Sequence, residues 1–116
     1  MFLPVFLSIV SFLLPATMVL FGILFIKRPP QDINSVFGYR TRRSSQSKAA
    51  WDFAHRCSGR FWLFGGILTA ILSGIVVAIT HGNIQFPYIV TGIMGFDIAV
   101  LLLVIPYTEI QLKRNF

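Results

Sequence analysis

The chain alternates between long apolar stretches and polar intervals. Apolar residues fill 2–26, 61–80 and 84–107, and Asp97 is the one charged residue within these stretches. Each stretch has roughly the 20 residues that a helix needs to cross the hydrocarbon core of a bilayer. We therefore expect an all-α integral membrane protein with three transmembrane helices, in a single membrane domain over residues 1–116.

The interval 27–60 separates the first two spans and carries eight of the ten Lys and Arg residues. Pro29 and Pro30 are expected to end the first helix, because proline disfavours helical geometry in the residue before it. Ser44 or Ser45 is expected to cap the next helix by accepting from its first N–H groups. Beyond this cap a charged residue recurs at every fourth position, which predicts an amphipathic interfacial helix that runs or bends into the second span. The charged positions are Lys48, Asp52, Arg56 and Arg60.

Small residues recur at every fourth position on the second and third apolar stretches, which is typical of close helix–helix contacts. They are Gly66, Ala70, Gly74 and Ala78 on one stretch, and Thr91, Gly95 and Ala99 on the other. We expect these two stripes to pack together, because the short turn 81–83 makes the two helices an antiparallel hairpin. Pro106 is expected to end the third helix and leave a tail at 108–116.

The distribution of positive charge predicts the orientation. All ten Lys and Arg residues lie in 27–60 and in the tail 108–116, whereas the turn 81–83 has none. By the positive-inside rule, the N-terminus is then outside and the loop and C-terminus are cytoplasmic. The first stretch has no basic residue ahead of its apolar run, unlike a secretory signal, so we expect a retained helix. The net charge of +6 between spans favours anionic phospholipid over nucleic acid as the partner.

The sequence offers little for catalysis or metal binding. His55 and Cys57 are two residues apart and would point to different sides of a helix. Cys57 falls on the apolar face of the predicted interfacial helix, where a free cysteine packs as a small apolar side chain. We expect no enzymatic activity, no cofactor and no metal.

Asp97 lies within a span, where a carboxyl group is costly and usually faces protein or water. No Lys or Arg lies between Phe61 and Leu112 to pair with it. A structural hydrogen bond between helices and a role with a ligand, an ion or a proton both remain open. Its candidate partners are Arg60, an equivalent residue of a second copy, and the hydroxyls of Thr17, Thr69 and Ser73.

The arginines between the first two spans could converge on an anion such as a lipid phosphate or a carboxylate terminus. The planar guanidinium group binds oxyanions with two parallel hydrogen bonds. The alternative is that these cations only fix the topology and touch anionic lipid without specificity. The arginines in question are Arg40, Arg42, Arg43, Arg56 and Arg60.

The same interval holds fixed residue types at fixed spacings. They are Asn34, the run Gly38-Tyr39-Arg40-Thr41, Ser45, Trp51, the run Ala54-His55-Arg56, and Gly59. This pattern resembles the signature of the SdpI family. The resemblance implies a small multi-pass protein of the bacterial inner membrane with this loop in the cytoplasm. The founding member is an immunity protein, which protects its producer from a secreted killing peptide and holds a transcriptional repressor at the membrane when the toxin is bound.

Physical roles follow for several of these positions. Gly38 permits a turn, and Arg40 and Arg56 supply charge-assisted donors. Trp51 suits the membrane interface, with a buried ring and an N–H in water. His55 is either a tie for the loop or a pH-sensitive donor. We expect a ligand or partner site formed by Asn34, Gly38, Tyr39, Arg40, Thr41, Ser45, Trp51, His55, Arg56 and Arg60.

Two functions of different classes follow from these observations. The first is an immunity or signalling protein that senses a membrane-active peptide toxin and acts on a cytoplasmic regulator through the surface 38–60. The second is a carrier or binding protein for an anionic lipid or small ligand, with arginines at the headgroup and Asp97 within the bundle. Two stripes of small residues offer more interface than one hairpin needs, so we also expect a homo-oligomer.

Overall fold

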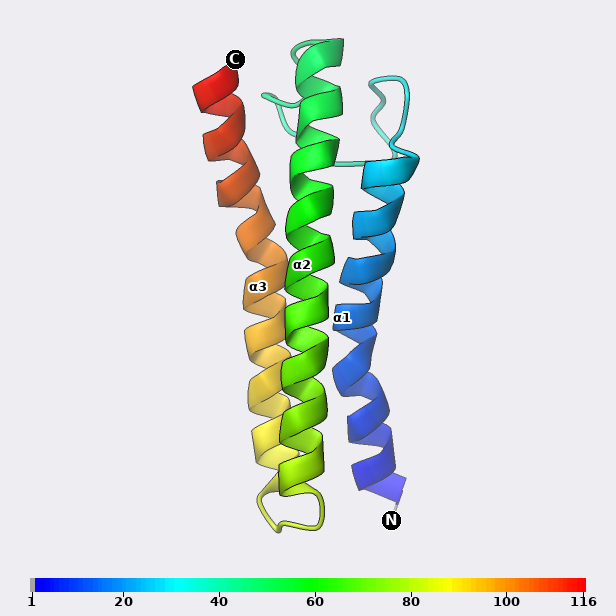
Figure 1. Cartoon of the computed structure of the whole chain (residues 1–116), viewed down its shortest axis with the longest axis vertical. Coiled ribbons are helices and arrows are strands. Elements are labelled where there is room, and N and C mark those ends of the chain that lie inside the picture. Colours follow the sequence, from blue (N-terminus) through cyan, green and yellow to red (C-terminus); the bar gives the residue numbers. More distant parts are fainter. Residues whose placement is uncertain (1) are drawn as a thin grey trace.

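The computed structural model describes residues 2–116, which form three helices joined by a long loop and a short turn. The helices are α1 (Phe2–Lys27), α2 (Lys48–Thr80) and α3 (Phe86–Asn115), and they run side by side along the long axis (Figure 1). All three are long and apolar enough to cross a membrane. The predictions of an all-α chain and of three candidate spans are therefore confirmed.

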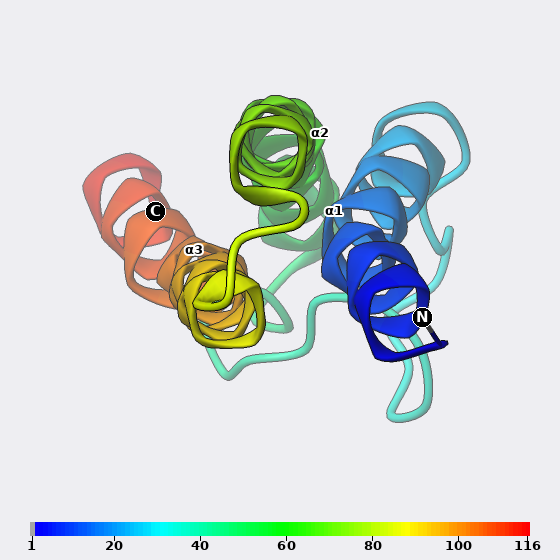
Figure 2. The same cartoon turned by 90° about the horizontal axis from the view of Figure 1, so that it is seen from below.

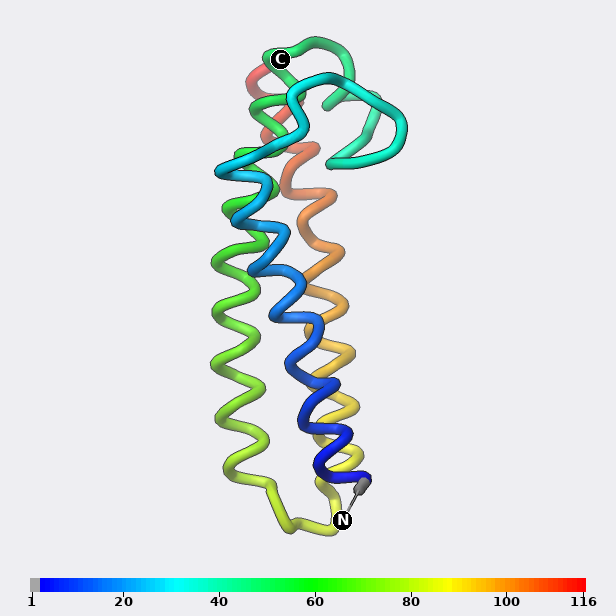
Figure 3. The backbone as a smooth tube through the Cα atoms, turned by 90° about the vertical axis from the view of Figure 1, so that its right-hand side faces the viewer, coloured from blue at the N-terminus to red at the C-terminus, as the bar shows by residue number. Residues whose placement is uncertain are grey.

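The two ends of the bundle differ in what they carry. The start of α1 and the turn after α2 lie at one end, and the loop 28–47 and the end of α3 lie at the other (Figure 3). We call the second end the loop end. The Lys and Arg residues, which occur only in 27–60 and at 113–114, belong to this half of the molecule. Which side of the membrane the loop end faces stays a prediction.

The helix α2 begins at Lys48, later than either predicted cap. Its N-cap is Ser47, whose hydroxyl accepts from the Ala50 N–H at 3.0 Å. The charged stripe then continues into the apolar part of α2 within one helix, which agrees with the expectation that it runs into the span. Within that stripe Lys48 Nζ donates to Asp52 Oδ1 at 2.8 Å. Its depth in the headgroup layer stays a prediction.

The helix α3 continues past Pro106 to Asn115, so the prediction that Pro106 ends it is wrong. A proline in a helix removes one backbone hydrogen bond, but spans tolerate this where neighbouring groups compensate. The turns beyond Pro106 are held by burial, because Thr108 and Leu112 are both fully buried at the loop end. Packing thus decides where the helix ends.

Glycine brings α1 and α2 into close contact. A Cβ atom added to Gly22 would lie 2.6 Å from the backbone nitrogen of Leu63, and one added to Gly66 would lie 2.9 Å from the carbonyl oxygen of Pro15. The small-residue stripe of α2 therefore faces α1. By contrast, a Cβ atom on Gly95 of α3 would meet no atom within 4 Å. The predicted contact between the two stripes is wrong, because a spacing of four defines a helix face but not the helix that covers it.

The helix α3 packs on α2 through larger side chains. Trp62 Nε1 donates to the Leu101 carbonyl oxygen at 3.1 Å, and the rings of Phe61 and Tyr107 have centroids 5.2 Å apart. Seen along the bundle, α1 and α3 lie on the same side of α2, and the loop crosses the space between them (Figure 2). Within residues 2–116 no side chain covers the stripe around Gly95, and the homo-oligomer stays a prediction.

Candidate functional site

Two buried side chains on the first turns of α2 hold the loop. His55 Nε2 accepts from the Tyr39 backbone N–H at 3.0 Å, and its Nδ1 lies 2.7 Å from the Trp51 carbonyl oxygen. Because Nε2 accepts, the proton must sit on Nδ1 and the imidazole is neutral. Trp51 Nε1 donates to the Pro30 carbonyl oxygen at 2.7 Å. His55 is therefore a loop tie, and the expectation that the Trp51 N–H lies in water is wrong.

Only glycine fits at position 38 of the loop, for two reasons. Its φ angle is +111°, which other residues rarely adopt. A Cβ atom at this position would also lie 2.5 Å from His55 Nε2. The glycine of the pattern therefore both permits the turn and lets the loop reach the imidazole.

Glu109 on α3 binds the other side of the loop. The hydroxyls of Tyr39 and Thr41 donate to its Oε2 at 2.8 Å and 2.9 Å, and Arg43 Nη1 lies 3.5 Å from its Oε1. Burial, together with the hydrogen bond to Glu109, raises the pKa of Tyr39, so its hydroxyl stays a donor. Glu109 was not among the site residues predicted from the sequence. The available signal was that it is the one acidic residue in the basic tail 108–116.

Ser44 closes the loop on itself. Its hydroxyl accepts from the Thr41 N–H at 2.8 Å and donates to the Tyr39 carbonyl oxygen at 3.0 Å. It is fully buried, whereas Ser45, which the sequence pattern indicated, is exposed. This engagement within the loop explains why Ser44 does not cap α2.

The tip of the loop is shaped by Asn34 and Arg40. Asn34 Oδ1 accepts from the N–H groups of Val36 and Phe37 at 2.9 Å and 2.8 Å, which is a local turn. Arg40 Nη1 donates to the Ser35 carbonyl oxygen. Both side chains therefore fix the loop, and both remain exposed at its surface.

The arginines do not meet at one point. Arg43 contributes to the ion pair at α3, and Arg56 lies in a groove beside the end of α1. Arg56 also lines a small hollow together with Arg60, next to Tyr107, but none of the loop arginines reaches it. The predicted convergence of the loop arginines with Arg56 and Arg60 on one anion therefore has no support in this arrangement.

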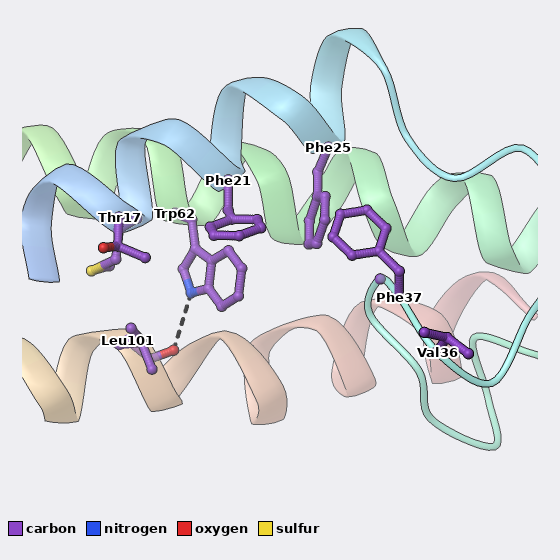
Figure 4. Close-up of a pocket in the computed structure, with 9 residues that line it drawn as sticks. Thr17, Phe21, Phe25, Val36, Phe37, Trp62 and Leu101 are labelled. Carbon is purple, nitrogen blue, oxygen red and sulfur yellow. Dashed lines mark hydrogen bonds between the residues drawn. The ribbon is translucent and has the colours of Figure 1, made fainter.

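An apolar groove of about 350 Å³ opens between α1 and α3 under the loop (Figure 4). Aromatic rings form much of it: Phe25 stacks on Trp62 with centroids 5.6 Å apart and meets Phe37 edge-on at 6.1 Å. A neighbouring hollow of about 240 Å³ continues it toward the rest of the motif. The lining residues are Thr17, Met18, Phe21, Phe25, Val36, Phe37, Gly38, Trp62 and Leu101. Three of these belong to the loop, so the loop forms the roof of the groove.

Asp97 is fully buried in α3, and neither of its carboxyl oxygens has a hydrogen-bond partner among residues 2–116. The hydroxyls proposed as partners are directed to backbone carbonyls instead. Thr17 bonds to Leu13, Thr69 bonds to Gly66, and Ser73 lies 3.5 Å from the carbonyl oxygen of Ser11. The predicted interhelical hydrogen bond is therefore absent within this described chain, and a role with an ion or a proton stays a prediction.

Comparison with known sequences places this arrangement in a family. The sequence model of the SdpI/YfhL protein family matches residues 31–108, which is more than half of the chain. The chain belongs to the SdpI/YfhL family. The resemblance seen in the loop pattern is thereby confirmed, and the match runs from the loop through α2 to the residue before Glu109.

A relative within this family comes from Bacillus subtilis (strain 168) and is named "Uncharacterized protein YfhL". It is 43% identical to this chain over 53 residues, which cover 46% of the chain and 48% of the relative. The matched segment thus spans about half the length of that protein. No solved structure matches the chain.

Proposed function

We propose that this SdpI/YfhL-family protein confers immunity to a membrane-active peptide and signals its presence to a cytoplasmic regulator. One observation carries the proposal: the loop 28–47 roofs the apolar groove and is bonded to α2 and α3 at the same time. His55 holds the Tyr39 backbone from α2, and Glu109 holds the Tyr39 hydroxyl from α3. A shift of α3 would therefore reach the loop through Tyr39 and also through Thr41, whose hydroxyl donates to the same carboxylate.

In this proposal the apolar groove binds the peptide. It lies between two helices that are apolar enough to cross a membrane, and its lining is almost entirely aromatic and aliphatic. An apolar segment of a peptide dissolved in the bilayer can reach such a site laterally, and its burial is favourable at about 25 cal/mol per Å² of apolar surface. The occupant separates α3 from α1 in this proposal.

In this proposal the loop contacts the cytoplasmic regulator. Because Tyr39 is held by α2 on one side and by α3 on the other, a shift of α3 must break or move one of the two attachments. The loop tip carries Ile33, Val36 and Phe37, which are exposed, and Val36 is 83% exposed. An apolar surface of this kind on a polar loop suits contact with another protein. The peptide shifts the balance between two loop positions, and the regulator binds one of them better.

A protection assay with matched glycine variants tests this function. Cells sensitive to a membrane-active peptide are challenged while they express the wild type, Gly38→Ala or Gly82→Ala. Both glycines have a positive φ angle, but a Cβ atom on Gly82 meets nothing within 4 Å, whereas one on Gly38 displaces His55. We expect survival to rise with the wild type and with Gly82→Ala. With Gly38→Ala, survival is expected to fall to that of cells that do not express the protein.

Equal amounts of all three proteins in the membrane fraction are the control. Unchanged killing with wild-type protein present would overturn the proposal for the peptides tested. Full protection by Gly38→Ala would instead show that protection does not depend on the conformation of the loop.

A further inference from the structure

A second groove, of a different character, lies at the loop end between the last residues of α1 and the first turns of α2. Its volume is about 550 Å³, within the range of about 300–1,000 Å³ that is usual for ligand pockets. Four cationic side chains and a single acidic one line it. The lining residues are Ile26, Lys27, Arg28, Pro29, Gln31, Lys48, Asp52 and Arg56.

The fold builds this groove from two segments that are distant in sequence. The helix α1 ends at Lys27, and the chain then turns so that the Pro30 carbonyl oxygen accepts from Trp51 Nε1. This bond fixes residues 27–31 against the start of α2. Arg28 and Arg56 therefore line the same groove, with Arg56 five residues beyond Trp51 along α2.

The charges in this groove are not balanced. Asp52 accepts from Lys48 at 2.8 Å, which accounts for one cation. Within residues 2–116, Lys27, Arg28 and Arg56 have no ion pair with an acidic side chain. Three unpaired cations around one concave surface raise the local concentration of anions. Guanidinium groups in particular bind phosphate oxygens in bidentate fashion.

The position of the groove along the bundle indicates the kind of anion. Its wall begins at Ile26, the last apolar residue of the stretch that fills α1, and the cations follow immediately. A site at the boundary between apolar span and polar loop lies at the depth of phospholipid headgroups. We propose that this groove binds the phosphate of an anionic phospholipid headgroup.

This assignment is independent of the proposed function, because it uses neither the apolar groove nor Glu109. It also differs from a general attraction between basic residues and the membrane. Arg42, Lys113 and Arg114 lie at the same end of the molecule, yet none of them lines this groove. A bound headgroup would bridge α1 and α2 beside the Trp51 anchor of the loop.

Native mass spectrometry from lipid nanodiscs tests the site. The nanodiscs contain phosphatidylglycerol and phosphatidylcholine, and three proteins are compared: the wild type, Lys27→Gln/Arg28→Gln/Arg56→Gln, and Arg42→Gln/Lys113→Gln/Arg114→Gln. Both triple variants lose the same charge. We expect one retained phosphatidylglycerol on the wild type and the second variant, and at least a tenfold lower occupancy on the first. Equal retention by the two variants, whether high or low, would overturn the proposal.

Should the first triple variant fail to fold, a single substitution that removes a negative charge from the groove provides a second test. Asp52→Asn removes the one acidic group of the groove and releases Lys48 from its pair. In nanodiscs with too little phosphatidylglycerol to fill the wild-type site, the occupancy is expected to be at least twofold higher in this variant. Retention that is unchanged or lower would count against the site.

Thermal unfolding in detergent separates a lipid headgroup from free phosphate. Added phosphatidylglycerol is expected to raise the Tm of the wild type and of the Arg42→Gln/Lys113→Gln/Arg114→Gln variant by mass action. Inorganic phosphate at the same concentration is expected to leave the Tm unchanged. An equal rise with inorganic phosphate would show a site for the free anion and overturn the assignment to lipid.

Discussion

The helix α2 makes different kinds of contact with α1 and with α3. Toward α1 the backbones almost touch, because Gly22 and Gly66 leave no side chain between the helices. Toward α3 the contact depends on long side chains such as Trp62, which reaches the Leu101 carbonyl oxygen from across the interface. One interface is fixed by backbone shape and the other by side chains that can change rotamer.

This difference indicates which helix can move. Close backbone contact admits few alternative arrangements, since any displacement of α1 opens voids along its whole length. The contacts of α3 instead include a hydrogen bond from the Trp62 side chain within the span and hydrogen bonds from the loop to the Glu109 side chain. The apolar groove lies on the same side, between α1 and α3. We therefore expect α1 and α2 to behave as a rigid pair and α3 to be the helix that moves.

The largest effect is expected for Gly22→Ala, which tests the rigid pair. The added Cβ atom would lie 2.6 Å from Leu63 N and 2.8 Å from the Gly59 carbonyl oxygen, both of them backbone atoms. We expect the free energy of unfolding to fall by about 3 kcal/mol, the upper part of the range for overpacking. Unfolding by sodium dodecyl sulfate, followed by circular dichroism, measures it.

Gly95→Ala is the matched control on α3, because its Cβ atom meets nothing within 4 Å. Its stability is expected to stay the same or to rise slightly through the helix propensity of alanine. If the two variants were equally stable, the close contact between α1 and α2 would be refuted.

An intermediate effect is expected for Glu109→Gln, which weakens the contact between α3 and the loop. Two hydroxyls and Arg43 meet at this carboxylate, and hydrogen bonds to charged groups are worth about 1.5–3 kcal/mol. We expect faster hydrogen exchange of the loop amides, equivalent to about 2 kcal/mol, with no change in the exchange of α1.

Arg43→Gln supplies the comparison within the same cluster. It removes only an ion pair at 3.5 Å whose arginine side chain is half exposed, and such pairs contribute less than about 1 kcal/mol. Loop exchange should therefore change little. An effect as large as that of Glu109→Gln would mean that the ion pair, and not the two hydroxyls, holds the loop.

The smallest effect is expected for Asp97→Leu, and its sign is opposite. Both carboxyl oxygens are buried without a partner in residues 2–116, and replacing an unsatisfied polar group by an apolar one of similar shape is neutral or stabilising. We expect a gain of about 1 kcal/mol in the same unfolding experiment, whereas Asp97→Asn should give none. A clear loss with leucine would reveal a partner for this carboxyl group.

The sequence was sufficient for the spans, because apolar length alone identifies a membrane helix. For His55 it offered a loop tie and a pH-sensitive donor side by side, because residue type and spacing do not show which group the ring contacts. It could not identify the helix that faces Gly66, because the 20-residue loop leaves the placement of α1 undetermined. Glu109 was missed for a similar reason: its partners are 66 or more positions away in the chain, and no local pattern connects them.

The errors at Ser44 and Pro106 have a common origin. Ser44 is a good capping residue by type, but the loop uses its hydroxyl elsewhere and Ser47 takes the cap. Pro106 is a helix breaker by type, but burial of the following turns keeps α3 helical. In both positions tertiary contacts outweighed a local preference, which single-residue rules cannot anticipate.

The length of α2 has a consequence for the choice of membrane. Its 33 residues span about 50 Å at 1.5 Å per residue, whereas a typical hydrocarbon core is about 30 Å thick. The surplus carries one charge per turn at Lys48, Asp52, Arg56 and Arg60, so a thicker bilayer would have to take in charged groups one turn at a time. Tilting cannot relieve this, because tilt shortens the reach of a helix. We therefore expect the charged residues at the start of α2 to disfavour insertion into thicker bilayers, so that the protein partitions into thinner membranes.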